Sequence, residues 1–200
     1  MNQNVSTVRA SKRLSTRQLT TVGMLSAISI VLGATGYGFI PTPFLAKVTI
    51  LHIPVIIGAI LEGPMVGFII GLIFGVFSLI QNYVAPTSAL FFAFQNPLVS
   101  VLPRILIGIT SYYTYRYIIV KNEAIKIGGA AVIGTVTNTF GVLTMVNILY
   151  AVRAAKVLKV TSDTVTKAIY GLALTNGIPE VIVAVIITVP VVMAVKRIRR

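Results

Sequence analysis

The sequence predicts an all-α integral membrane protein, built as a bundle of six transmembrane helices, and its composition and apolar runs are the reason. Hydrophobic residues make up 56% of the 200 residues, charged residues only 10%, and the mean hydropathy is +0.94. Ordinary soluble domains carry about 25% charged residues. The apolar residues fall into runs of membrane-spanning length that Gly, Pro and charged residues interrupt. We therefore expect a basic cytosolic tail at 1–17 and one membrane domain at 18–200.

These apolar runs place the helices near 18–38, 48–62, 64–83, 96–119, 125–151 and 166–196. The second run is short and begins around His52-Ile-Pro54, which predicts a helix that starts partway into the protein. The sixth contains Asn176-Gly-Ile-Pro179, where the proline predicts a kink or a break. Irregular backbone at membrane depth is tolerated where it lines a cavity, so these two helices are the expected cavity walls.

The distribution of Lys and Arg predicts that both termini lie in the cytosol. The first 17 residues are polar and basic, and no cleavable signal peptide is expected. Basic residues gather on the cytosolic side of membrane proteins. With six spans, the inner side holds Arg9, Lys12, Arg13, Arg17, Arg116, Lys121, Lys126, Lys196, Arg197, Arg199 and Arg200, and the outer side holds Lys47, Arg153, Lys156, Lys159 and Lys167. The basic outer loop 152–167 has two open interpretations, a solvated loop or a surface that attracts anions.

Several functional classes find no support in the sequence. The absence of Cys excludes disulfides, iron–sulfur clusters and cysteine-ligated zinc, and a single His with four acidic residues predicts no metal site. The net charge of +13 is concentrated at segment ends, which argues against nucleic-acid binding. No phosphate-binding loop or hydrolase motif is present, so we expect no bound cofactor. An intramembrane enzyme using His52 with Glu62 or Glu180 stays an alternative.

Arg104 is the strongest candidate for a functional residue, because it lies in an apolar run otherwise fit to cross a bilayer. Its guanidinium stays protonated, and its planar set of donors matches a carboxylate or a phosphate. The alternative is an internal ion pair, for which the chain offers only Glu62, Glu123, Asp163 and Glu180. Anion binding and a structural ion pair both stay open, with Glu180 as the candidate counter-ion.

Further polar residues are predicted to lie near Arg104. Asn96 and Pro97 are typical of a helix start, and four-residue steps put Asn96, Ser100 and Arg104 on one helical face. Asn138 is predicted to face the protein interior, because its amide would have no hydrogen-bond partner in lipid, so it either contacts a ligand or bonds a neighbouring helix. His52, Gln95 and Asn176 complete the predicted binding residues. The aromatic side chains of Phe91, Phe92 and Phe94 serve as interfacial anchors or cover a bound molecule.

Small residues mark two helix faces. Gly63, Gly67, Gly71 and Gly75 recur every four residues and predict close packing against another helix. Gly23 and Ala27 form a second pair near the cytosolic end of the first helix, which serves either internal packing or docking of another subunit.

Together, several segments resemble the substrate-binding S components of energy-coupling factor (ECF) transporters. They are Ile40-Pro-Thr-Pro43, Thr49-Ile-Leu-His-Ile-Pro-Val-Ile-Ile-Gly58, Glu62-Gly-Pro64 with Gly67, and Asn96-Pro-Leu-Val-Ser-Val-Leu-Pro-Arg104. The resemblance covers about 18–198 and is strongest to pantothenate-specific members, through the His52 and Asn96 segments. Riboflavin, folate and other vitamins are substrates of related S components.

This resemblance implies a multi-pass protein of the bacterial cell membrane that binds a vitamin from outside. It implies as partners a membrane coupling (T) subunit and two cytosolic ABC ATPases, which use the ATP. The family's Ala-xxx-Ala docking motif corresponds here to Gly23 and Ala27. Arg104 is expected to receive the carboxylate of pantothenate, and Asn138 its amide or hydroxyl groups. The alternatives are an S component for another vitamin, a solitary secondary transporter, or a channel-like membrane protein.

Overall fold

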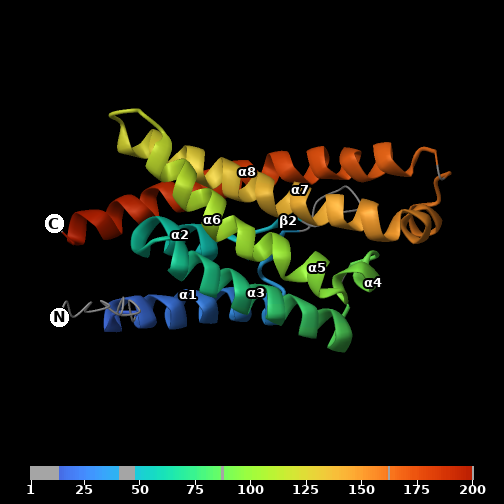
Figure 1. The fold of residues 1–200 in the computed structure, drawn as a ribbon, viewed down its shortest axis with the longest axis horizontal. Helices are drawn as coiled ribbons and strands as arrows, with labels where there is room; N and C mark the ends of the chain where they lie inside the picture. The colour runs from blue at the N-terminus through green and yellow to red at the C-terminus, as the bar shows by residue number, and fades with distance from the viewer. Residues whose placement is uncertain (1–13, 41–47, 87, 162, 200) are drawn as a thin grey trace, which may run out of the picture.

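The helices lie roughly along one long axis and run back and forth between the two ends of the molecule (Figure 1). The computed structural model describes residues 14–40, 48–86, 88–161 and 163–199. Their elements are α1 (Thr16–Thr35), β1 (Phe39–Ile40), β2 (Val48–Thr49), α2 (Ile53–Glu62), α3 (Pro64–Val84), α4 (Phe91–Phe94), α5 (Pro97–Ser100), α6 (Leu102–Tyr117), α7 (Glu123–Leu158) and α8 (Val165–Ile198). We call the end where α1 begins and α8 ends the basal end, and the opposite end, with α4 and α5, the distal end.

The second helix begins at Ile53, as predicted from the segment His52-Ile-Pro54, and not at residue 48, where the apolar run starts. Residues 48 and 49 form β2, which pairs with β1 in a two-stranded antiparallel sheet, and α2 begins only at Ile53. The physical reason is Pro54, which has no backbone N–H and fits only within the first helical turn. A helix from residue 48 would have placed this proline in its interior.

The predicted helix 96–119 is interrupted at Val101, between α5 and α6. Asn96 caps α5, as expected, since its side chain accepts a hydrogen bond from the backbone N–H of Leu98 at 2.9 Å. Pro103 has no N–H to donate to the carbonyl of Val99 four residues earlier. The prediction of one continuous helix over 96–119 was therefore wrong, because the structure forms two helices, α5 and α6, that meet at Val101.

The last two helices also differ from the prediction. α7 continues past residue 151 to Leu158, with a kink at Tyr150 (φ −137°, ψ 20°), so Arg153 and Lys156 belong to a helix and not to the predicted loop. α8 runs without a break through Pro179. One missing backbone hydrogen bond is tolerated here because α8 is long and packs along α7.

Four helices among the described residues, α1, α3, α7 and α8, are long and apolar enough to cross a membrane. At 1.5 Å per residue, the ten residues of α2 extend only about 15 Å and the sixteen of α6 about 24 Å, short of the roughly 30 Å hydrocarbon core. The count of six spans and the cytosolic termini stay predictions. Of the basic residues used for the orientation, Arg9, Lys12, Arg13, Lys47 and Arg200 lie outside the described residues.

The glycine stripe of α3 packs against α6, which confirms its predicted role in internal packing. A Cβ added at Gly67 would lie 2.9 Å from the Cα of Gly108, and one added at Gly75 would lie 2.7 Å from the Cα of Val101. At Gly71 an added Cβ would collide with the backbone of α6. Gly63 does not belong to this stripe: it joins α2 to α3 with φ +102°, a conformation that favours glycine.

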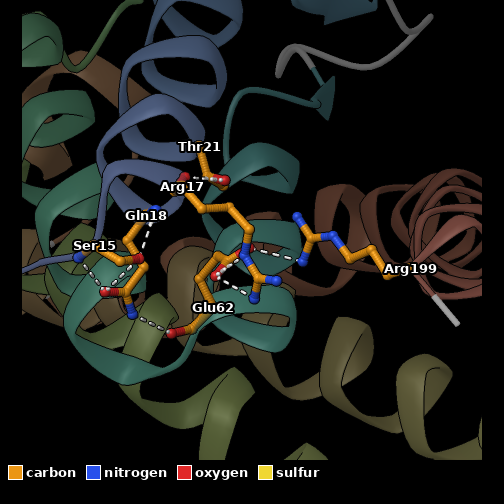
Figure 2. A network of polar contacts seen from close by, with 6 residues as sticks. All are labelled: Ser15, Arg17, Gln18, Thr21, Glu62 and Arg199. Atoms are coloured by element: carbon orange, nitrogen blue, oxygen red, sulfur yellow. Dashed lines mark hydrogen bonds and ion pairs between the residues drawn. The ribbon is translucent and has the colours of Figure 1, made fainter.

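A buried carboxylate ties three helices together at the basal end (Figure 2). Glu62, at the end of α2, has a side chain only 2% exposed. Arg17 of α1 donates to its Oε2 at 3.0 Å, and Nη1 of Arg199, beyond α8, forms an ion pair with its Oε1 at 2.7 Å, without the geometry of a directed hydrogen bond. A capping box of Ser15 and Gln18 starts α1 beside this group. Both ends of the membrane domain are therefore held at one carboxylate.

Two hydrophobic clusters fill the interior. The basal cluster contains Ile107 of α6, Ile127 of α7 and Ala184 of α8, among others. The distal cluster contains Val99 of α5, with Val142 and Val146 of α7 and Val165 and Ile169 of α8, among others. In α6, α7 and α8, the buried polar side chains Arg104, Asn138 and Glu180 lie between the residues of the two clusters.

Candidate substrate-binding site

Buried polar side chains from α6, α7, α8 and the residue that precedes α2 form a layer between the two hydrophobic clusters. We call this set the polar layer; its members are His52, Arg104, Thr135, Asn138, Thr139 and Glu180, each at most 7% exposed. Thr135, Asn138 and Thr139 share one face of α7 by their spacing of three and four residues. Hydrogen bonds join His52 to Thr135 and Glu180 to Thr139, and the guanidinium of Arg104 lies near both His52 and Glu180. The fold thus brings together residues that are far apart in the sequence.

One hydrogen bond and two aromatic rings fix the position of the Arg104 guanidinium. Its Nη1 donates to the carbonyl of Val99 at 2.8 Å, the same carbonyl that Pro103 leaves without its helical donor. Its guanidinium carbon lies 5.6 Å from the ring centre of Phe74 and 5.4 Å from that of Phe94, within cation–π range. The Nε atom is buried without a hydrogen-bond partner. The guanidinium is therefore oriented, yet it retains unused donors.

The ion pair between Arg104 and Glu180, which the sequence left open as an alternative, is not formed. All four acidic residues are among the described residues, and none has a carboxylate oxygen within 4.0 Å of an Arg104 nitrogen. Glu180 accepts hydrogen bonds from the backbone N–H of Thr49 at 2.8 Å and from Oγ1 of Thr139 at 2.5 Å. Hydrogen bonds from β2 and α7 thus hold this carboxylate, and Arg104 has no direct counter-ion among the described residues.

His52 and Asn138 each have one polar atom without a partner. The Nε2 of the fully buried His52 lies 2.9 Å from the hydroxyl of Thr135, while its Nδ1 has no partner. The Oδ1 of Asn138 is likewise buried and unpaired. A buried polar atom without a hydrogen bond is costly and rare in proteins. Arg104, His52 and Asn138 therefore share the property expected of groups that contact a ligand.

The other predicted binding residues have partners or lie at the margin. Ser100 is buried and donates to the carbonyl of Phe94, and Gln95 donates to the carbonyl of Asn82 at 3.3 Å. Asn96 caps α5 and also donates to the hydroxyl of Tyr150 at 3.1 Å. Asn176 is half-buried, one turn before the polar layer residue of α8. The first three hold the local structure of the distal end, and a direct contact with substrate stays a prediction for all four.

Aromatic contacts connect α4 to the kink of α7 at the distal end. The ring of Phe92 packs edge-on against Tyr150, with the ring centres 5.7 Å apart, and Arg153 lies over Phe92 at 4.3 Å. Phe94 faces Arg104 from the same short helix. The sequence singled out these phenylalanines, but it gave no indication of Phe74, whose position beside Arg104 follows only from the packing of α3 on α6.

The predicted docking pair lies on the outside of α1. Gly23 and Ala27 are both exposed, and a Cβ added at Gly23 would have no heavy atom within 4 Å. Within the described part of the bundle, this face is therefore not used for packing. A large exposed side chain, Met24, lies beside it.

Residues 17–192 match the family described as the substrate-specific component of ECF transporters. The chain belongs to this family. The resemblance seen in the sequence is thereby confirmed, and this S component is a membrane transport protein from a family that is not one of enzymes.

Two relatives and one solved structure are similar to this S component. The pantothenic acid transporter PanT of Lactococcus lactis subsp. cremoris is 36% identical over 170 residues, covering 78% of this chain and 82% of that protein. The pantothenate transporter PanT of Leuconostoc mesenteroides subsp. mesenteroides is 29% identical over 146 residues, covering 71% and 72%. The structure of ThiT from Listeria monocytogenes has a TM-score of 0.50 and 17% identity, covering 84% and 93%, and so supports the fold.

Proposed function

We propose that this S component binds pantothenate in the polar layer and delivers it across the bacterial cell membrane. The observation that carries the proposal is Arg104, a buried guanidinium with unused donors and no carboxylate partner among the residues that the structure describes. A permanent charge at this depth is costly unless an anion compensates it. The names of the two PanT relatives indicate which anion to expect.

The chemistry of pantothenate suits the polar layer. Its single carboxylate would pair with Arg104, whose planar donors match a carboxylate and whose alternative counter-ion is occupied elsewhere. Its amide and hydroxyl groups would bond Asn138 and His52, which have the unpaired atoms Oδ1 and Nδ1. Phe74 and Phe94 beside the guanidinium would exclude water and strengthen the charge pair.

The proposed orientation places both termini in the cytosol and the distal end outside. The basal end carries Arg17, Lys196 and Arg199, in agreement with the preference of basic residues for the cytosolic side. In this arrangement, α2 and β2 together make one crossing and α5 and α6 another, so that the chain crosses the membrane six times. The distal end, with α4, would then face incoming vitamin.

Transport would require a coupling subunit and two ATPases. The exposed small residues Gly23 and Ala27 on α1 allow the backbone of another helix to approach closely, which supports docking of the coupling subunit there. The partner ATPases would supply the energy, since this chain contains no phosphate-binding loop.

The test is calorimetric titration of the detergent-purified S component with pantothenate, riboflavin, folate and the neutral alcohol analogue of pantothenate. We expect saturable, tight binding of pantothenate and weak binding of the alcohol, since a buried guanidinium facing a neutral group lacks its compensating charge. Equal affinity for the neutral alcohol would contradict the role of Arg104. Preferential binding of riboflavin or folate would contradict the choice of vitamin.

A further inference from the structure

The carboxylate of Glu180 is a second charged group in the polar layer. Its side chain comes from α8, it is 4% exposed, and none of the ion pairs among the described residues includes it. One oxygen, Oε1, accepts from the backbone of Thr49, and the other, Oε2, accepts from Thr139. Both donors are neutral. The carboxylate is therefore fixed in position from two sides by elements that come from distant parts of the chain.

This carboxylate retains capacity to accept hydrogen bonds. An ionised carboxylate offers about four lone-pair sites, and those of Glu180 meet the hydroxyl of Thr139 and the backbone N–H and hydroxyl of Thr49, which leaves room for a further donor. Buried charged acceptors are stabilised by additional donors, and the desolvated surroundings make each such bond stronger than in water. A ligand that enters the polar layer with hydroxyl groups would supply these donors.

The positive charge of Arg104 and the negative charge of Glu180 make the two sides of the polar layer electrostatically different. Arg104 on α6 and Glu180 on α8 interact electrostatically without forming an ion pair, and the unpaired Oδ1 of Asn138 comes from α7, which packs against both helices. An anionic group is attracted to the first charge and repelled by the second. A ligand with a carboxylate at one end and hydroxyl donors at the other fits this arrangement in only one orientation.

We propose that Glu180 is a specificity-determining residue that accepts hydrogen bonds from the hydroxyl groups of the ligand and thereby sets its orientation. This inference rests on the proposed function, and it names the feature of the substrate that Glu180 would recognise, which is hydroxyl groups that lie away from the carboxylate. A site built to bond a hydroxyl discriminates against an analogue that lacks it, because the buried acceptor then stays unpaired.

The alternative is that Glu180 only holds β2 in place through Thr49, and a thermodynamic cycle distinguishes the two roles. The variant Glu180→Gln keeps the shape of the side chain but removes its charge. Calorimetry would measure the parent and the variant with pantothenate and with an analogue in which both hydroxyl groups are replaced by hydrogen. We expect the variant to bind pantothenate about tenfold more weakly, the difference between charge-assisted and neutral hydrogen bonds, and to bind the deoxy analogue like the parent.

A purely structural role predicts equal losses for both ligands, and that result would overturn the inference. Glu123→Gln is the matched control, because it is the same substitution at the basal end, beside Lys196, and should change neither affinity. If Glu180→Gln does not fold, the same cycle is measured with Glu180→Asp, which keeps the charge but withdraws it from the ligand. A loss of affinity confined to pantothenate would support the proposal, and equal losses for pantothenate and the deoxy analogue would overturn it.

The failure of this inference can be separated from failure of the proposed function. A parent protein that does not bind pantothenate, or that binds its neutral alcohol equally well, contradicts the function assigned through Arg104. A parent protein that binds pantothenate tightly and requires its carboxylate, but shows no coupling between Glu180 and the hydroxyl groups, contradicts only the role proposed for Glu180.

Discussion

Replacement of Arg104 by alanine is the most direct perturbation of the proposed site. The guanidinium is 6% exposed, Nη1 is committed to the carbonyl of Val99, and the buried Nε is free for a ligand. Truncating one partner of a buried, hydrogen-bonded charge pair costs about 2–5 kcal/mol. At 1.4 kcal/mol for each factor of ten, this predicts a roughly 30- to 4,000-fold loss of affinity for pantothenate.

A conservative substitution separates charge from geometry. Arg104→Lys keeps the positive charge but presents a compact ammonium group, which cannot match both carboxylate oxygens as a planar guanidinium does. We expect affinity between those of the parent and of Arg104→Ala. Arg116→Ala is the matched control, because it removes an exposed arginine from the last turn of α6, away from the polar layer.

Stability must be measured beside affinity, because Arg104 also donates to a backbone carbonyl. Loss of that hydrogen bond costs about 1 kcal/mol, which thermal unfolding in detergent would detect. Calorimetry on a folded Arg104→Ala variant then shows whether the guanidinium binds the carboxylate of pantothenate. A variant that unfolds cooperatively and binds pantothenate as tightly as the parent would refute the argument that this guanidinium receives the carboxylate.

Three further predictions concern the helices around the site. Gly23→Leu should leave pantothenate affinity unchanged but abolish capture of the coupling subunit in a pull-down; normal assembly with lost vitamin binding would contradict docking at this face. Gly71→Ala should lower the unfolding temperature, since the added Cβ collides with the α6 backbone at a cost of about 1–3 kcal/mol, and an unchanged temperature would show that α3 and α6 can separate. Replacing both Arg17 and Arg199 by alanine should destabilise the protein more than Glu62→Gln, because only the double variant leaves a buried carboxylate unpaired; the reverse order of unfolding temperatures would contradict this reasoning.

Local chemistry explains which parts of the fold were predictable. Long apolar runs and their interruption by Pro and Gly identified the membrane helices, because hydrophobic length and missing N–H groups act on the chain segment that contains them. The predicted helix boundaries were wrong where the local effect of a proline competed with the packing of neighbouring helices. Pro103 interrupted the helix that was predicted as continuous, whereas Pro179 did not, since α8 packs along α7 over much of its length.

For the candidate site too, some features could be predicted from the sequence and others depended on the tertiary structure. The sequence by itself determined that Arg104 is an unusual charge in an apolar segment and that His52 and Asn138 are polar groups without an aqueous environment. Whether Glu180 neutralises that charge depended on distances between α6 and α8, which no local pattern encodes. Only the tertiary structure decided that Thr49 and Thr139 hold Glu180, that Arg104 has no carboxylate partner, and that Phe74 lies beside its guanidinium. The physical reason is that pairing of buried groups is settled by the packing of whole helices, in which residues more than a hundred positions apart come within hydrogen-bonding distance.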